Sequence, residues 1–417
     1  MNRKGTERRG GENVYEDYFG IGKVLYCTAF ALYVFQAFIS RTEIIDILLV
    51  DSDECKFYIM MAAFNLLILK AVLYQRVGIL RTIAGTALIV LGFVTWITSG
   101  SNLFLWMAAF VACGKNIKIR SLAWVSICVH LPGFVIVVWM SMSGFIENYV
   151  LERGEFLRFS MGFSNPNSFA LMLFDICLAI CVIRFGKRPG WEIGVIALSA
   201  YLSYRISISR TFTAALILMA ALYLIFWFAR SRAIRRVIAS VLMAAAAVII
   251  IFSMYSMANY SLHDAWMVSF DEMMSSRISM AHDIFTEYPL TYWGRNYSEA
   301  EAIYDGTRYL KFIVDNSYCS VILRYGIVAA AVLFSGIAAV YANALWKVNW
   351  GVCLLGISIF IIIGFSETMM IRVEDNYFLI AIAGILYQTP ADNLCIPEKN
   401  QRKSKKIKEN GLRDPER

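Results

Sequence analysis

Long apolar segments alternate with short polar ones along most of the chain. A helix that crosses a bilayer needs roughly 20 apolar residues, and we expect about twelve such segments. Their predicted limits are 21–40, 57–73, 83–99, 102–114, 121–142, 165–184, 191–204, 210–229, 237–255, 317–345, 350–366 and 376–390. Only helices satisfy their own backbone hydrogen bonds in lipid at this length, and the alternation typical of a membrane barrel is absent. The pattern therefore predicts an all-α polytopic membrane protein.

One long polar segment, from about 256 to 316, interrupts this pattern. It lies within a single transmembrane domain, 21–390, and we expect it to form a large loop. A charged arm, 1–20, precedes the domain, and a basic tail, 391–417, follows it. Both are poor in apolar residues, so we expect them to be disordered.

The composition supports a membrane protein, and the distribution of basic residues predicts its orientation. Of the 417 residues, 59% are hydrophobic and 17% are charged, whereas a soluble domain has about 25% charged residues. Basic residues gather in alternate connections, for example at Arg232, Arg235 and Arg236. By the positive-inside rule both termini are cytoplasmic and the long loop is extracytoplasmic. The net charge of +8 reflects this topology and gives no support for nucleic-acid binding.

Two kinds of feature are absent from the sequence. No cleavage site of small residues follows the polar start, so we expect no removable signal peptide. The nine cysteines are scattered, without a zinc spacing or a disulfide framework. We therefore predict no metal site and no cofactor.

The long loop contains a segment with helical periodicity, 264–288. Apolar residues recur on one stripe, and Pro289 marks the end of the predicted helix. Arg277 lies in the middle of this stripe, where an arginine that faces inward needs an anionic partner. That partner is either a structural carboxylate or the phosphate of a ligand, and the sequence does not decide between them.

Several further polar groups lie where predicted spans begin. Asn165 before Pro166 is typical of a helix start, whose free amides bind anions. This start, with Asn167 and the upstream Arg158, is either a binding site or a helix entry beside an arginine that reaches the lipid headgroups. Arg205 and Arg210 flank a tight turn between two spans, and they either reach the headgroups or point into a cavity.

Other ionisable residues fall inside or at the ends of the predicted spans. Asp315 or Asn316 is expected to cap the tenth span, Arg324 lies about two turns into it, and Glu367 and Arg372 follow the eleventh. Charges at such depths tend to face a cavity. Asp175 and His130 lie near mid-depth of two neighbouring spans, where they form either a structural hydrogen-bonded pair or part of a proton relay.

The arginines on the outer side share one chemistry. Arginine suits bidentate recognition of phosphate, and no nucleotide-binding loop is present in the sequence. A lipid-linked diphosphate presented from the outer leaflet fits this arrangement.

The ordered motifs resemble those of a known bacterial family. They are Arg158-x3-Gly-Phe-x-Asn165-Pro-Asn167, then Ser-Arg210-Thr, then the large outer loop, then Asp315-Asn316-Ser-Tyr with Gly326 beyond. This set resembles the O-antigen ligase and Wzy-type polysaccharide polymerase superfamily. Ligases of that family carry a His-Asn pair at the end of the loop. Asp315 replaces the histidine here, and Ala329 stands three residues after the glycine, which favours the polymerase side.

The resemblance implies a metal-independent, inverting glycosyl transfer at the outer face of the cytoplasmic membrane. The donor would be a polyprenyl-diphosphate-linked oligosaccharide, and a sugar hydroxyl of a second lipid-linked unit would attack it. Arg210 and Arg277 match the arginines that stabilise the leaving diphosphate, with Arg158 a weaker candidate. Asp315 would be the base, with Glu367 as its substitute. The remaining expected substrate-binding residues are Asn165, Asn167, Arg205, Asn316 and Arg324.

The expected arrangement is a lid over a cavity. The loop would bring Arg277 and Asp315 over a cavity whose floor holds Arg210. The expected partners are membrane lipid, a flippase and a chain-length regulator. A glycan ligase, which differs only in its acceptor, and a flippase or transporter that uses Asp175 and His130 remain the alternative functions.

Overall fold

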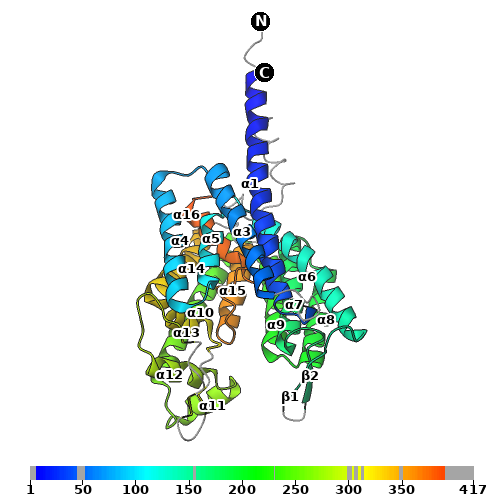
Figure 1. Ribbon diagram of the computed structural model, residues 1–417, viewed down its shortest axis with the longest axis vertical. Coiled ribbons are helices and arrows are strands. Elements are labelled where there is room, and N and C mark those ends of the chain that lie inside the picture. Colours follow the sequence, from blue (N-terminus) through cyan, green and yellow to red (C-terminus); the bar gives the residue numbers. More distant parts are fainter. Residues whose placement is uncertain are drawn as a thin grey trace.

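The computed structural model describes residues 6–44, 52–153, 156–229, 231–297, 303–304, 309–310, 314–346 and 351–389. Within these residues the chain is a bundle of helices with two small antiparallel hairpins (Figure 1). This agrees with the predicted all-α class. The predicted basic tail, 391–417, and much of the second half of the long loop fall outside the described residues.

The bundle consists of helices joined by short connections. They are α1 (Thr6–Ile39), α3 (Ser52–Tyr74), α4 (Ile79–Ser99), α5 (Leu103–Ala112), α6 (Ile119–Met142), α7 (Pro166–Arg184), α8 (Trp191–Leu202), α9 (Arg210–Phe228), α10 (Arg232–Asn259), α11 (Ala265–Met273), α12 (Arg277–Glu287), α13 (Ser317–Ser320), α14 (Gly326–Trp346), α15 (Gly351–Gly364) and α16 (Ile380–Leu386). Single π-helical turns, Ser203–Ser207 and Val321–Tyr325, precede α9 and α14, and a 3-10 turn, Tyr377–Leu379, precedes α16. The hairpins are β1 (Val150–Arg153) with β2 (Phe156–Phe159), and β3 (Ile303–Tyr304) with β4 (Tyr309–Leu310).

Eight of the described helices are long and apolar enough to cross a membrane. These spans are Gly20–Ile39, Asp53–Tyr74, Ile79–Ser99, Ile119–Met142, Pro166–Arg184, Arg210–Phe228, Arg232–Asn259 and Ser317–Trp346. Shorter apolar helices, α5, α15 and the one formed by Tyr377–Leu386, occupy three of the other predicted spans, and α8 occupies the fourth. The chain thus has the helices of a membrane-embedded protein, while the count of twelve crossings stays a prediction.

The start of the chain differs from the sequence prediction. We expected a disordered arm over 1–20, but α1 begins at Thr6 and continues without interruption into the first apolar span. In Figure 1 this helix extends beyond the rest of the bundle. Helix formation propagates cheaply from an existing helix, which explains why the polar residues before Gly20 continue the span.

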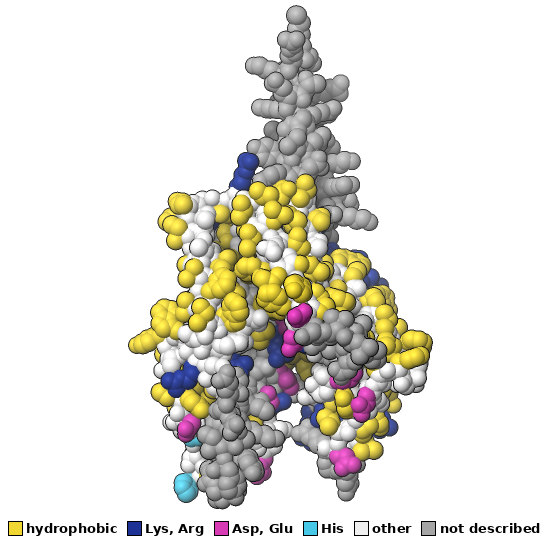
Figure 2. Space-filling view, viewed as in Figure 1, with side chains coloured by type: hydrophobic (Ala, Val, Ile, Leu, Met, Phe, Trp, Pro, Cys, Tyr) yellow, Lys and Arg dark blue, Asp and Glu magenta, His cyan; other side chains and the backbone are white. Residues whose placement is uncertain are grey.

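The core of the bundle is α7. Its apolar window is 83% buried inside the protein, against 17% for the windows of α3, α4 and α10. Helices α6, α8 and α9 pack around α7, so protein surrounds it on most sides. Figure 2 shows hydrophobic side chains over the outer surface of the bundle, as expected where helices contact lipid.

The hairpin β1–β2 and helices α11 and α12 lie at one end of the bundle, which we call the loop end (Figure 1). Figure 2 shows a hollow between two lobes at this end, with Lys or Arg and Asp or Glu side chains in it. The polar residues of the predicted long loop therefore contribute to one end of the molecule.

The single helix predicted over 264–288 is two helices. α11 ends at Met273, and both Ser275 and Ser276 have φ of +61°, in the left-handed region that stops a helix. α12 then begins at Arg277 and ends at Glu287, before Pro289 as predicted. The break interrupts the helical periodicity, so the predicted stripe is not continuous. Trp266 and Met273 are exposed, whereas Ile278, Ala281 and Ile284 are buried.

Candidate functional site

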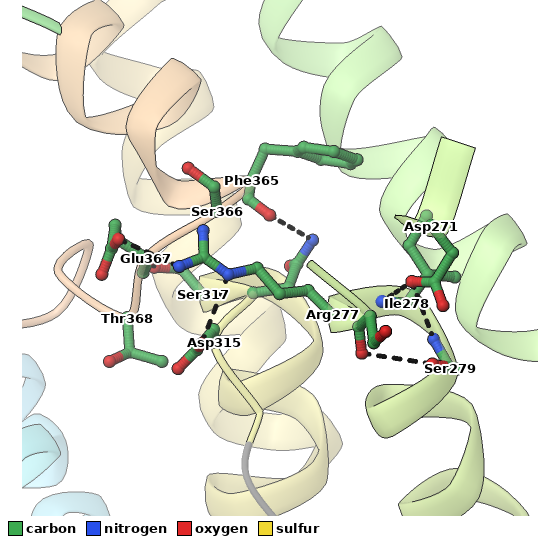
Figure 3. Close-up of polar contacts among 12 residues, drawn as sticks. Asp271, Arg277, Ile278, Ser279, Asp315, Ser317, Phe365, Ser366, Glu367 and Thr368 are labelled. Carbon is green, nitrogen blue, oxygen red and sulfur yellow. Dashed lines mark hydrogen bonds and ion pairs between the residues drawn. The ribbon is translucent and has the colours of Figure 1, made fainter. Parts of the chain in front are cut away.

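Arg277 is held between two carboxylates. Its Nε lies 3.3 Å from Oδ2 of Asp315, and a terminal nitrogen lies 3.2 Å from Oε1 of Glu367 (Figure 3). We call these three residues the Arg277 group. The sequence left open whether the partner of Arg277 is a carboxylate or a ligand phosphate, and in the structure two of its guanidinium nitrogens each contact a carboxylate.

Asp271 fixes the place where Arg277 begins its helix. Oδ1 of Asp271 accepts hydrogen bonds from the backbone amides of Ile278, at 2.8 Å, and Ser279, at 3.2 Å. Ser276, the residue in the capping position, makes no such bond through its own side chain. The buried aspartate of α11 therefore caps α12 across the break, and a cap of this kind contributes about 1 kcal/mol.

Asn316 anchors the other side of the group. Its side-chain oxygen accepts hydrogen bonds from the amides of Tyr318, at 2.9 Å, and Cys319, at 3.1 Å, so Asn316 caps α13. Its amide nitrogen donates to Oγ of Ser253 and to the carbonyl of Phe365, both at 3.1 Å. The sequence predicted a cap at Asp315 or Asn316, and the structure assigns it to Asn316, which leaves the Asp315 carboxylate for Arg277.

The segment that joins α15 to the turn before α16, residues 365–376, carries Glu367. We call it the 365–376 loop. The hydroxyl of Ser317 donates to the backbone carbonyl of Glu367 and accepts a hydrogen bond from the amide of Met370, at 3.3 Å. Figure 3 shows Asp315 and Glu367 at two neighbouring nitrogens of the Arg277 guanidinium. The loop and the start of α13 are therefore fixed together, although about fifty residues separate them.

A cavity of about 430 Å³ opens beside Asp315, within the range usual for small-molecule sites. Its polar lining includes Asp315, Ser317, Ser320, Arg324, Thr368 and Arg372, and its other lining residues include Leu103, Tyr297 and Tyr325. Two arginines thus face one cavity, together with a single carboxylate that is already paired with Arg277. This balance of charge favours an anionic ligand.

Neither of these two arginines is paired with a carboxylate among the described residues. Arg372 donates to Oγ1 of Thr368, at 3.3 Å, and Arg324 lies over the ring of Tyr297, 4.9 Å from its centroid. The Nε atoms of both are buried and have no hydrogen-bond partner in the described part of the chain. A buried donor without a partner costs free energy, so these guanidinium groups are positioned to bind an acceptor from a ligand.

Gly326 explains how Arg324 reaches the cavity. Arg324 lies in the π-helical turn Val321–Tyr325, and Gly326 ends that turn with φ of +86°. A Cβ on Gly326 would lie 2.4 Å from the backbone nitrogen of Gly294. The amide of Arg295 donates to the carbonyl of Arg324, at 2.9 Å. Glycine is therefore needed for the loop after Pro289 to contact this turn directly.

Burial also changes the ionisation of Glu367. Burial raises the pKa of this carboxyl group above its usual value of 4.5, and the positive charge of Arg277 opposes part of that rise. The negative charge of Asp315 adds to it. Asp315 is more exposed than Glu367, with 39% against 17% of its side-chain surface accessible. Asp315 is thus the carboxylate of the group that solvent and ligands reach more easily.

A second set of predicted residues meets at the start of α7. Arg158 donates to the side-chain oxygen of Asn167, at 2.6 Å, and to the carbonyl of Ser207, at 2.7 Å. Asn165 accepts from the amide of Ser168, at 2.9 Å, and so caps α7 with Pro166 in the first turn, as predicted. These contacts join β2, α7 and the turn before α9. Arg158 and the two asparagines thus hold the entry of α7.

Arg205 and Arg210 lie beside this entry, in the π-helical turn and at the first residue of α9. Both side chains are exposed. We expected Arg210 on the floor of the cavity beneath Asp315, and this is wrong. The cavity is lined by Arg324 and Arg372 instead, because α13, the π-helical turn Val321–Tyr325 and the 365–376 loop border it, and no residue of α9 does.

Asp175 and His130 do not form the hydrogen-bonded pair that the sequence allowed. His130 shares a hydrogen bond with Oγ of Ser126 on its own helix, at 3.1 Å. Neither carboxylate oxygen of Asp175 has a hydrogen-bond partner among the described residues. The two side chains are buried on the neighbouring helices α6 and α7, but no hydrogen bond between them is present.

Two important residues of this region were missed by the sequence reasoning. Glu374 and Asp375, at the far end of the 365–376 loop, are buried and bind Arg41. The signal was present, because Arg372-Val-Glu374-Asp375 places three charges in a short connection between two strongly apolar helices.

No family model, no curated protein and no solved structure matches this chain.

Proposed function

We propose that the protein polymerises lipid-linked oligosaccharide repeat units, as in capsule, exopolysaccharide or O-antigen synthesis. The reaction is an inverting glycosyl transfer from a polyprenyl-diphosphate donor to a sugar hydroxyl of a second lipid-linked unit. The proposal combines the ordered motifs of the sequence with one observation: a cavity that holds Asp315 and two arginines without carboxylate partners, Arg324 and Arg372.

The arginines would bind the diphosphate of the donor. When the bond between the anomeric carbon and the phosphate oxygen breaks, negative charge develops on the leaving diphosphate. Guanidinium groups fixed in place before the reaction stabilise that charge without reorganising. Arg324 and Arg372 face the cavity directly.

Asp315 would accept the proton of the attacking hydroxyl. The acceptor oxygen forms the new bond to the anomeric carbon on the face opposite the diphosphate, and its proton passes to the carboxylate. Arg277 would orient that carboxylate through its Nε, and Glu367 holds a terminal nitrogen of Arg277. A base positioned in this way contributes roughly 10²–10⁴-fold to a rate.

The expected topology is consistent with this chemistry. Twelve crossings with both termini in the cytoplasm would place the loop end at the outer face of a bacterial cytoplasmic membrane. A polyprenyl chain would then remain in the bilayer while its diphosphate enters the cavity between the helices. Arg158, Arg205, Asn165, Asn167 and Asn316 would shape the surrounding surface, most of them by holding backbone segments.

The test is elongation by the purified protein in detergent. Given a synthetic polyprenyl-diphosphate-linked repeat unit, the wild type should yield a ladder of longer lipid-linked glycans and release polyprenyl diphosphate. Arg324→Ala and Arg372→Ala should each lower the rate by roughly 10²–10³-fold. Arg232→Ala is the matched control, since Arg232 is an exposed first residue of a helix and does not line the cavity.

Two outcomes would oppose the proposal. Normal elongation by both cavity variants would remove the role of these arginines. Transfer of the glycan only to an acceptor that lacks a diphosphate would identify a ligase.

A further inference from the structure

A second group of charged residues lies inside the bundle, at the other end of the 365–376 loop. Arg41 binds both oxygens of Asp375, at 2.7 and 2.9 Å, and lies 3.3 Å from Oε1 of Glu374. The side chains of Asp375 and Glu374 are only 0% and 5% exposed. We call Arg41, Glu374 and Asp375 the Arg41 group.

Backbone contacts fix Arg41 in this position. It follows α1, and its carbonyl accepts a hydrogen bond from the amide of Ser164, at 2.9 Å. Thr42 pairs with Phe163 in an isolated β-bridge. The chain after α1 is thereby joined to the segment that leads into α7, and Asp175 lies on α7 itself, more than two turns after its start.

Asp175 is the unexplained residue of this region. It is 2% exposed, and neither of its carboxylate oxygens has a hydrogen-bond donor among the described residues. It lies beside Asp375, close enough for a hydrogen bond between the two carboxyl groups. Two ionised carboxylates have no proton to share, and at this distance they repel each other strongly.

The surrounding groups do not supply the missing donor. All three contacts that Arg41 makes with carboxylate oxygens among the described residues are to Asp375 and Glu374, and His130 of α6 bonds with Ser126. The other titratable or charged groups around the two aspartates are Tyr33 and Arg41 from the α1 side, and Arg372, Glu374 and Tyr377 from the loop and the turn before α16.

A metal ion does not fit this cluster either. Within the described ranges, no three or more His, Cys, Asp or Glu side chains are arranged to hold one. Three carboxylates, those of Asp175, Glu374 and Asp375, thus lie near a single bidentate arginine, Arg41. In the protein interior an unpaired charge costs several kcal/mol.

We propose that Asp175 and Asp375 share one bound proton. Asp375 stays ionised because Arg41 binds both of its oxygens, so Asp175 carries the proton and donates it to Asp375. The pair forms a proton-binding site in the interior, and its hydrogen bond joins α7 to the loop that also carries Thr368 and Arg372. This inference rests on the Arg41 group and Asp175 alone, and does not depend on the proposed glycosyl transfer.

Infrared spectroscopy of the purified full-length protein at neutral pH tests this directly. The wild type should show the carbonyl stretching band of a protonated carboxyl group, shifted on exchange into D2O, and Asp175→Asn should lose that band. Glu192→Gln is the matched control. Glu192 is also fully buried, but it is paired with Arg184 and Tyr223, so its removal should leave the band in place.

Each result decides the proposal. Absence of the band in the wild type overturns it, even if Asp175→Asn proves too unstable to purify, and so does an unchanged band in Asp175→Asn. Thermal unfolding gives a second measurement. The folded wild type holds a proton that the unfolded chain releases above about pH 4, so its melting temperature should fall with rising pH more steeply than that of Asp175→Asn. Equal slopes would contradict a shared proton.

Discussion

The Arg41 group and the Arg277 group each contain one arginine, one aspartate and one glutamate, and they lie at the two ends of the 365–376 loop. In the Arg41 group the arginine holds both oxygens of its aspartate at 2.7 and 2.9 Å, and that aspartate is 0% exposed. In the Arg277 group the arginine makes one contact with each carboxylate, at 3.2 and 3.3 Å, and its aspartate is 39% exposed. The same three residue types thus form a rigid buried anchor at one end and an accessible, adjustable group beside a cavity at the other.

This difference indicates a division of roles. A buried, bidentate pair holds its loop firmly, and its burial keeps it out of reach of a ligand. A partly exposed, loosely held aspartate contributes little to folding and remains available for proton transfer. The 365–376 loop therefore has an anchored end and an accessible end, and the Arg41, Asp315 and Glu367 variants below each affect one end more than the other.

Removal of Arg41 should have the largest effect. Arg41→Ala leaves Asp375 and Glu374 buried without their cation, and breaking such a pair costs roughly 3–5 kcal/mol. We expect low yields of folded protein in size-exclusion chromatography and a large drop in melting temperature. Arg41→Lys keeps the charge but not the bidentate geometry, so it should be intermediate. A normal melting temperature for Arg41→Ala would contradict the role of anchor.

Asp315→Asn should lower the elongation rate strongly while leaving the stability nearly unchanged. The proposed base is lost, so elongation should fall by roughly 10²–10⁴-fold. The ion pair with Arg277 is partly exposed, so the loss of stability should be about 0–1 kcal/mol. The measurements are elongation rate and melting temperature of the same preparation. Full activity of this variant would exclude Asp315 as the base.

Gly326→Ala tests the turn that presents Arg324. Backbone angles like those of Gly326, φ of +86° and ψ of 172°, suit glycine almost alone, and another residue costs roughly 1–3 kcal/mol there. The added Cβ would also collide with Gly294. Gly194→Ala in α8 is the control, because nothing lies within 4 Å of its Cβ position and alanine favours a helix. Equal melting temperatures for the two variants would count against the close backbone contact.

The smallest effect is the pH dependence of Glu367. Its pKa is raised by burial, so its contribution to stability is fully present below the usual pKa of 4.5 and is lost as pH rises through the folded value. The melting temperature of the wild type should therefore fall relative to that of Glu367→Gln as pH rises from about 4 to about 8. A wild-type melting temperature that instead rises relative to that of Glu367→Gln over this range would show that the attraction of Arg277 outweighs burial.

The sequence predicted the features that depend on neighbouring residues. Apolar length predicted where most of the long apolar helices lie, Asn165 with Pro166 predicted the start of α7, and Pro289 predicted the end of α12. Each of these depends on local backbone chemistry, which a short window of sequence contains.

The features that depend on distant segments could not be predicted in this way. Two consecutive serines with positive φ break the loop helix, because the buried Asp271 caps α12 from α11. Arg41 and Asp375 are more than three hundred residues apart, and no local pattern joins them. The cavity beside Asp315 is lined by α13, the turn Val321–Tyr325, the 365–376 loop and Tyr297 together, and no local pattern predicts that assembly, so we expected Arg210 there in place of Arg372.

The most direct test of this account compares Asp315→Asn with Asp375→Asn in one experiment. Elongation of a lipid-diphosphate-linked repeat unit and melting temperature are measured on the same purified samples. We predict that Asp315→Asn melts like the wild type but elongates at least about 100-fold more slowly, and that Asp375→Asn melts at a clearly lower temperature than the wild type. A stable, fully active Asp315→Asn together with a stable Asp375→Asn would contradict it.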